Sequence, residues 1–240
     1  MDTACNFALM SAFNALHDIT WSFQYSLCGP PDSTGGFTTF LYDAATPVLT
    51  GGGVRSGLCY GPYVDNEVLI ISPTIDDKIS IARPSFGGYI KISTGVDAGV
   101  YQMGLSGALV GVGFDSTGSF AARKRGFLSG LINTPPNSMT VRTGSEFVYQ
   151  GSDVLNFNIL EQTEVYRTLR FNLTDLGQTI NIHQKNNTTH KYDLIGSYDT
   201  DLLFVDDQFC KIGFSFASPI NTGYKSILKL KDFHYHGKTN

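Results

Sequence analysis

Short segments in which apolar and polar residues alternate recur along the whole chain, and this pattern limits the fold more than any other feature. In WSFQYSLC (21–28) the larger apolar residues stand at every second position, which is the period of a strand with one buried face. Comparable segments follow at roughly ten-residue spacing, separated by Gly, Pro, Asp and Asn. They are GFTTFLYDA, EVLIIS, KISIA, YIKIS, ALVGVGF, SMTVRT, YRTLRFNLTD, QTINIHQ, DLLFVD, KIGFSFAS and SILKLKDFHYHG. These segments predict an all-β fold, an antiparallel sandwich, with helical turns at most within 4–17 and 123–132.

The 240 residues are interpreted as one domain. Charged residues make up 16% of the chain, below the usual figure of about 25%, which suits strands and tight turns better than the charged surfaces of helices. No proline- or serine-rich linker divides the chain, and no internal repeat is found. We therefore expect residues 19–240 to form a single sandwich, with residues 1–18 packing on it or leading into it.

The charge pattern and the N-terminus exclude several classes of partner. The formal net charge is −4 and no basic block stands out, which argues against nucleic-acid binding. The N-terminal stretch has no cationic start and contains two Asp residues, so it does not resemble a secretory signal peptide. The most apolar window, residues 99–114, is interrupted by glycines and is interpreted as two strands. We expect neither a nucleic-acid partner nor membrane insertion.

The cysteines and histidines do not form a metal-binding pattern. The cysteines are Cys5, Cys28, Cys59 and Cys210. They lack CxxC spacing, and in the absence of a signal peptide free, largely buried thiols are the better interpretation. His234 and His236 would project from one face of a strand, as two metal ligands require, but near the C-terminus they are better explained as solvent-facing side chains.

Known signatures of catalysis are missing. A serine nucleophile would stand in G-x-S-x-G, whereas GVRSG (53–57) and GFLSG (126–130) carry the serine one place late. Glycosidases built on such a sandwich hold two carboxylates about 5–5.5 Å apart. No such arrangement is offered by the glutamates of this chain, Glu67, Glu146, Glu161 and Glu164. EQTE, which contains the last two, is interpreted as a solvated turn. We expect no enzymatic activity.

Three N-glycosylation sequons are present, NLT at Asn172, NNT at Asn186 and NTT at Asn187. Asn and Thr are also common turn residues. Without a signal peptide, the sequence alone yields no prediction from these motifs.

GALVGVGFDSTGSF (107–120) fits a phosphate loop, a metal- or sugar-binding loop, or a strand that runs into a turn. A phosphate loop needs a Gly-Lys-Ser/Thr step ahead of a helix, and no lysine follows Gly118 directly. If the segment is a strand, one of its faces carries the apolar residues Val110, Val112 and Phe114. The segment is therefore interpreted as a core strand that delivers Asp115 to a turn, where its carboxylate caps the backbone.

In their order along residues 19–237, these motifs resemble the L-type lectin-like family of concanavalin-like and legume lectins. ITWSFQYSL resembles the family's early aromatic strand, GGFTTFLYDA its glycine-led GLAFFLAP strand, and GGGVRSGLCYG its glycine-rich loop. VGVGFDS stands where the family has its VEFDT metal strand. LRFNLTD, INIHQ and KIGFSFAS…LKDFHYHG resemble the closing strands. The resemblance implies an antiparallel jelly-roll β-sandwich of the concanavalin-like lectin type.

The family's metal and sugar ligands are mostly replaced. Its sugar-binding Asp falls on Gly35, and its metal-binding Glu falls on Gly113. The aromatic and the Asn of its loop fall on Thr117 and Ser119, and its later acidic ligand falls within the basic AARKRG. A Ca²⁺ ion needs about six or more oxygen ligands, largely anionic, and of the carboxylates only Asp115 remains. We therefore expect no metal and no other cofactor.

The resemblance also implies that residues 32–36, 51–57 and 115–119 lie together at one end of the sandwich. Glycines in this region would let backbone amides approach a ligand closely. Arginine would supply charge-assisted hydrogen bonds, and tyrosine a ring for the apolar face of a sugar. The candidate ligand-binding residues are Gly52, Gly53, Arg55, Tyr60, Asp115 and Ser119, with Tyr63 and Tyr89 as further candidate rings.

Three functional interpretations remain open. The first is a non-catalytic surface module of a virus or phage particle that binds host glycans or decorates the assembly. The second is a free carbohydrate-binding lectin, and the third, least supported, is a glycan-active enzyme. Glycans or neighbouring protein subunits are the expected partners, within an oligomeric assembly. The particle interpretation places the protein at a virion or extracellular surface without a signal peptide.

Overall fold

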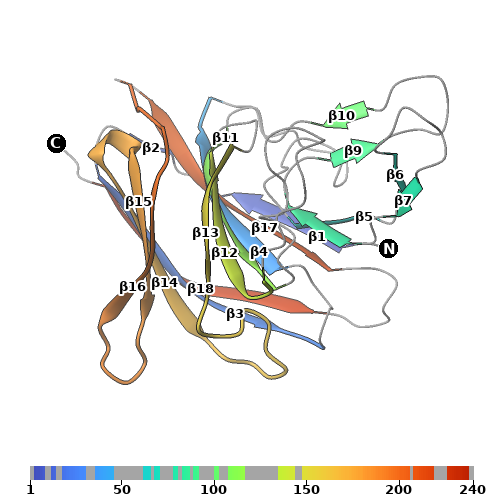
Figure 1. The fold of residues 1–240 in the computed structure, drawn as a ribbon. Helices are drawn as coiled ribbons and strands as arrows, with labels where there is room; N and C mark the ends of the chain where they lie inside the picture. Colours follow the sequence, from blue (N-terminus) through green and yellow to red (C-terminus); the bar gives the residue numbers. More distant parts are fainter. Residues whose placement is uncertain are drawn as a thin grey trace.

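The protein folds around two antiparallel β-sheets packed face to face, and it has three further two-stranded sheets (Figure 1). The structure, a computed structural model, describes residues 3–8, 12–14, 18–30, 36–45, 62–65, 68–70, 78–80, 83–86, 89–91, 100–102, 108–116, 135–143, 148–205, 208–218 and 226–237. The strands are β1 (Thr3–Ala8), β2 (Phe13–Asn14), β3 (Ile19–Cys28), β4 (Gly36–Asp43), β5 (Pro62–Asp65), β6 (Val68–Ile70), β7 (Lys78–Ser80), β8 (Arg83–Phe86), β9 (Tyr89–Lys91), β10 (Val100–Gln102), β11 (Ala108–Asp115), β12 (Ser138–Thr143), β13 (Val148–Val154), β14 (Arg167–Thr174), β15 (Thr179–Lys185), β16 (Tyr192–Asp199), β17 (Phe209–Ser218) and β18 (Ile227–Gly237). A short 3₁₀ turn, η1 (Asp175–Gly177), joins β14 to β15. The two-stranded sheets are β5–β8, β6–β7 and β9–β10.

The larger sheet has seven strands in the order β1-β17-β4-β11-β12-β13, with β2 also paired to β17. The smaller sheet has five strands in the order β16-β15-β14-β3-β18. Neighbouring strands run antiparallel in both sheets, and most are distant in sequence, as in the pairing of β3 with β14 and β18. The all-β, antiparallel sandwich predicted from the strand pattern is therefore confirmed.

Two expectations about local structure were wrong. The 4–17 stretch was expected to carry a helical turn or two, if any regular structure. Part of it forms β1 and β2 instead, because β17 offers each of them a partner strand. DLLFVD was expected to be a strand, yet residues 201–205 are irregular. In that segment the Phe204 N–H donates to the Leu176 carbonyl at 3.0 Å, so its backbone is bonded to a turn rather than to a strand. The 123–132 stretch lies outside the described residues.

An aromatic core fills the space between the sheets. Alternate residues of β3 are buried there, as the sequence pattern predicted, and so are the three apolar residues of β11. The Phe171 ring stacks on Trp21 at a centroid distance of 4.9 Å and on Phe23 at 5.6 Å. Phe114 of the other sheet meets Phe171 edge-on at 6.2 Å. Such ring pairs add about 0.5–1.5 kcal/mol each beyond the burial of their area.

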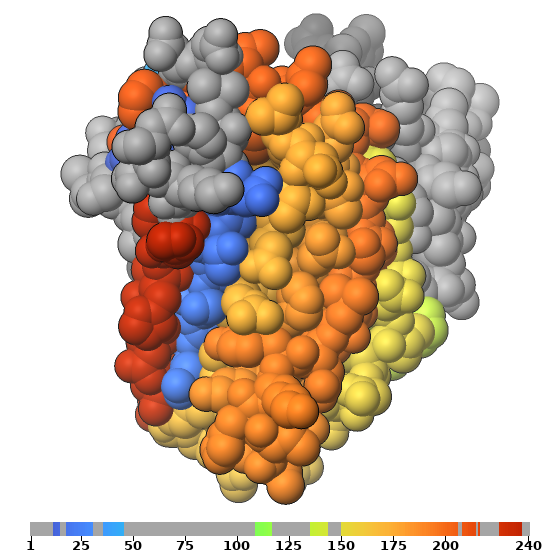
Figure 2. Space-filling view, turned by 90° about the vertical axis from the view of Figure 1, so that its left-hand side faces the viewer, coloured from blue at the N-terminus to red at the C-terminus, as the bar shows by residue number. Residues whose placement is uncertain are grey.

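The outer face of the five-stranded sheet is polar and lies open in the described structure (Figure 2). Hydrogen bonds between side chains cross this face from strand to strand. The Thr20 hydroxyl donates to Asn172 Oδ1 at 3.1 Å, and the Ser197 hydroxyl donates to Asn181 Oδ1 at 2.7 Å. The alternation of buried and half-buried residues in β14 follows directly from this two-sided environment.

The seven-stranded sheet is buried on both faces along β4. Phe37 and Leu41 belong to the core between the sheets, whereas Phe40 and Tyr42 point away from it and are buried as well. Strand β5 lies close to β17 and β4, on the side of this sheet that faces away from the five-stranded sheet. The run of buried residues through β4 matches what a strand covered on both faces shows.

Strand β4 begins at a glycine that the β4–β11 pairing requires. Gly36 has φ = +117°, a conformation that L side chains rarely adopt. A Cβ atom at this position would lie 1.9 Å from the backbone oxygen of Phe114. Because a backbone atom cannot move aside as a flexible side chain can, only glycine allows β4 and β11 to start and end side by side.

We expect Gly36→Ala to lower the free energy of unfolding by about 2 kcal/mol or more, because it combines backbone strain with a main-chain clash. Chemical denaturation followed by tryptophan fluorescence measures the loss. Gln162→Ala, at an exposed site, is the control and should change the stability by less than about 0.5 kcal/mol. Equal stability of both variants would show that β4 does not approach β11 as described.

Candidate functional site

One end of the seven-stranded sheet brings together the start of β4, the end of β11 and the start of β12. Asp115 lies directly opposite Gly36 on one side and Ser138 on the other. The Asp115 side chain is 0% exposed. Its carboxylate is therefore enclosed at this end of the sandwich.

Two polar residues at this end were not singled out from the sequence. The Ser138 hydroxyl is buried and has no hydrogen-bond partner among the described residues. Asn137 has φ = +57°, and its Oδ1 accepts a hydrogen bond from the Ile159 N–H at 3.1 Å. The Asn137 carbonyl also accepts the Leu155 N–H at 2.8 Å, so this residue fixes the 155–161 loop against the start of β12. Asn directly after Pro-Pro was the available signal, because it is typical of a turn.

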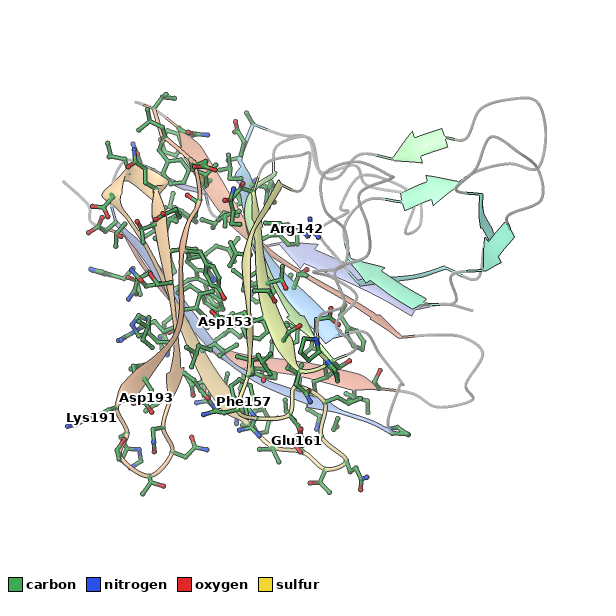
Figure 3. All side chains as sticks on the ribbon, in the orientation of Figure 1. Arg142, Asp153, Phe157, Glu161, Lys191 and Asp193 are labelled. Carbon is green, nitrogen blue, oxygen red and sulfur yellow. The ribbon has the colours of Figure 1, made fainter. Side chains whose placement is uncertain are left out.

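The 155–161 loop is also attached to the other sheet, through Glu161 (Figure 3). Glu161 forms an ion pair with Arg167 at 2.6 Å, and the Arg167 guanidinium lies 4.7 Å from the centroid of the Phe157 ring. The Glu161 N–H donates to the Leu27 carbonyl at 3.0 Å, and its own carbonyl accepts the Gly29 N–H at 2.9 Å. Glu161 therefore links the end of β3 to this loop and is half-buried, whereas the other three residues of EQTE are exposed, as expected for a solvated turn.

The second glutamate of EQTE is exposed and paired with a cation. Glu164 accepts a hydrogen bond from Lys229, and this bond, with a second one from Tyr166, holds the pKa of the Glu164 carboxyl below its ordinary value. The same pairing raises the pKa of the Lys229 ammonium. Both glutamates of EQTE thus serve ion pairs at the surface of the fold.

The structure places some of the predicted ligand-binding residues and not others. It brings Gly36 and Asp115 together as cross-strand neighbours, as the resemblance implied for the ends of their segments. Five candidates lie outside the described residues, and their convergence stays a prediction. They are Gly52, Gly53, Arg55, Tyr60 and Ser119. Asp115 is placed at the expected end of the sandwich but is buried there rather than open to a ligand.

The described histidines and cysteines form no cluster at this end, although Cys28, the last residue of β3, pairs with Glu161 of the 155–161 loop. His234 and His236 are exposed on the outer face of the five-stranded sheet, opposite Ser22 and Thr20, as expected for solvent-facing residues. Cys28 and Cys210 are free thiols, and burial raises the pKa of Cys210 to about 12. Within the described part of the chain, no three His, Cys, Asp or Glu side chains are grouped to hold a metal ion. No helix among the described residues is long and apolar enough to span a membrane.

Comparison with known proteins finds likeness in structure but not in sequence. No family model matches the chain, and no curated protein matches it either. Among solved structures, lectin II from Ulex europaeus superimposes with a TM-score of 0.56 at 9% identity, over 100% of this chain and 83% of the lectin. The potassium-bound carbohydrate recognition domain of Emp46p gives 0.54 at 10% identity, over 98% and 78%. Peanut lectin bound to a nine-residue peptide gives 0.51 at 11% identity, over 100% and 83%.

Identities this low establish a shared fold and nothing finer. The likeness extends over nearly the whole chain, so it covers both sheets and the end that holds Gly36 and Asp115. The chain therefore has the antiparallel jelly-roll sandwich fold of the L-type lectins, as its sequence motifs predicted.

Proposed function

We propose that the chain is a non-catalytic carbohydrate-binding module whose ligand binds at the end of the sandwich marked by Gly36 and Asp115. The observation that carries this proposal is the cross-strand contact of these two residues, at the end of the sheet where β4 begins and β11 ends. The neighbours in structure support it, because one of them, lectin UEA-II, was solved in complex with galactose and another is a carbohydrate recognition domain.

In this proposal the buried and the loop residues have different roles. Asp115 is enclosed, so it holds the turn that leads to Ser119 instead of contacting the sugar itself. Gly52 and Gly53 present backbone amides to the ligand, since neither carries a Cβ. Arg55 supplies charge-assisted hydrogen bonds, and the Tyr60 ring stacks on the apolar face of a sugar.

The residues present do not fit a bound Ca²⁺ or Mn²⁺ ion. Gly113, where the lectin motif has its second carboxylate, lies between Thr38 and Thr140 on the neighbouring strands. These neighbours offer hydroxyls, and the one carboxylate on this face of β11 is that of Asp115. A hard cation needs about six or more oxygen ligands, largely anionic. The proposed site therefore binds its ligand without a metal ion.

We expect a chelator to leave the melting temperature and any glycan binding unchanged. A metal present at a hundredfold excess over its Kd would add about 2.7 kcal/mol to the stability. Thermal melts with EDTA and with added Ca²⁺ or Mn²⁺ make the comparison. A melting point several degrees lower in EDTA would mean that residues outside those described complete a metal site.

We expect Arg55→Ala to weaken glycan binding by roughly tenfold or more, because it removes hydrogen bonds from a charged group. A glycan array, followed by titration of the best ligand, measures the loss. The matched control is Arg170→Ala, which removes an arginine from the outer face of the five-stranded sheet, where Arg170 lies over the Tyr192 ring. Equal binding by both variants, or loss in the control alone, would contradict the proposed site.

The placement of this module on a virus or phage particle is the finer part of our proposal. It is supported by exposed aliphatic side chains at the opposite end of the sandwich, where β14 turns into β15. Leu176 is 44% exposed, Leu203 63% and Val205 62%. Clusters of exposed apolar residues mark interaction sites more often than scattered ones do. We propose that neighbouring subunits of the assembly cover this group of three residues.

This aliphatic group is held in place by its own hydrogen bonds. The Phe204 N–H donates to the Leu176 carbonyl, and the Thr200 N–H donates to the Gln178 carbonyl at 2.8 Å. The buried Phe204 ring lies against Gly177, where a Cβ would come within 2.7 Å of it. Leu176 itself has φ = +56°, an unfavourable conformation for a leucine that the surrounding bonds maintain.

We expect the double variant Leu176→Asn/Leu203→Asn to reduce the share of chain that co-purifies with the particle by roughly tenfold or more, since it removes apolar contact area. Quantitative blotting of purified particles measures that share, and the glycan array is the internal control. Glycan binding should stay at the wild-type level, because the two ends of the sandwich are separate. A wild-type chain that is absent from particles would refute this placement.

A further inference from the structure

The three N-glycosylation sequons lie in different environments in the structure, and these environments decide which asparagine can accept a glycan. Asn172 lies in the middle of the five-stranded sheet, on β14. Asn186 and Asn187 lie at the turn that joins β15 to β16, in the hairpin that extends past the sheets below the labelled Lys191 and Asp193 (Figure 3). An oligosaccharide needs an acceptor amide that is exposed and not required by the fold.

Asn172 does not meet this condition. It is half-buried between two neighbouring strands, directly opposite Thr20 on β3 and Asn181 on β15. Its Oδ1 accepts a hydrogen bond from the Thr20 hydroxyl at 3.1 Å. The next residue, Leu173, is in the core, so this sequon is part of the packed sheet.

Asn186 is exposed to a limited extent, and its side chain builds the turn. Its Oδ1 accepts hydrogen bonds from the N–H groups of Thr188 at 2.9 Å and Thr189 at 3.0 Å. Its Nδ2 donates to Asp193 Oδ2 at 3.3 Å. The Asn186 carbonyl also accepts the His190 N–H at 2.8 Å, which closes the turn. Both ends of this amide are therefore in use.

Asn187, the next residue, differs from Asn186 both in its exposure and in its side-chain hydrogen bonding. Its side chain is exposed, and it makes no side-chain hydrogen bond to the described residues. The residues that follow it, Thr188 and Thr189, are exposed as well, so the whole sequon is open to solvent. The turn that presents Asn187 is already fixed by Asn186, and a group attached to Asn187 would extend away from both sheets.

We propose that Asn187 is an N-glycosylation site, and that it is the acceptor among the three sequons when the chain passes through a secretory pathway. The donor is an oligosaccharide linked to a lipid diphosphate, transferred by an oligosaccharyltransferase. A bond forms between Asn187 Nδ2 and the anomeric carbon of the sugar, while the bond from that carbon to the phosphate oxygen breaks. The lipid diphosphate leaves with the bonding electrons, and the amide loses one proton.

The overlapping sequons provide matched variants for the test. Thr189→Ala removes the sequon of Asn187 and leaves that of Asn186 intact. Thr188→Ala removes the sequon of Asn186 and leaves that of Asn187, since the middle position accepts alanine. Both threonines are exposed on the same turn, and Thr189→Ala additionally removes a long hydrogen bond, 3.4 Å, that the Thr189 hydroxyl accepts from the Lys191 N–H. Thr174→Ala removes the sequon of Asn172.

The full chain behind a cleavable leader is expressed in a eukaryotic secretory host. Secreted and membrane-enclosed fractions are both analysed by intact mass and by gel shift with endoglycosidase, so that poor secretion does not conceal a glycan. We expect one glycan on the wild-type chain, on the Thr188→Ala variant and on the Thr174→Ala variant. We expect none on Thr189→Ala. A wild-type chain without a glycan, or a glycan that persists in Thr189→Ala, overturns the proposal.

Discussion

The stacking of Phe171 against Trp21 and Phe23, with Phe114 meeting it edge-on from the other sheet, is the contact on which the sandwich depends. It joins β14 to β3 within one sheet and both of them to β11 across the core. These rings fill the space between the two sheets, where close packing holds them against one another.

The close approach of Gly36 to the backbone of Phe114 sets the geometry of the candidate binding end. It places Asp115 directly opposite Gly36, and the Asp115 side chain is fully enclosed. In the proposed function, contact with a ligand is left to the segments beyond the strands. Hydroxyls and glycines stand there in place of the carboxylates that a metal ion needs, and amides, an arginine and a ring would hold a carbohydrate.

The two ends of the sandwich differ in chemistry, and the difference has a structural origin. At one end Asn137 and Glu161 attach the 155–161 loop to β12 and to β3, which covers the apolar edge there. At the other end Phe204 is drawn inward against Gly177, and its neighbours Leu203 and Val205 are left facing solvent. The described residues of one end are thus joined by polar contacts, whereas the other end leaves aliphatic side chains exposed.

The sequence by itself determined the all-β class, the aromatic strand at 21–28, the buried face of β11 and the likeness to lectins, because alternation at period two reports directly which side chains face a core. Only the tertiary structure decided the outcome where the partner strand is remote in sequence. Residues 3–8 form a strand because β17 pairs with them. DLLFVD shows alternating burial but forms no strand, because its backbone is hydrogen-bonded to the β14–β15 turn. The burial of Asp115 was likewise set by β4 and β12. Hydrogen bonds and burial between distant segments cannot be read from local pattern, since they exist only once the sheets have assembled.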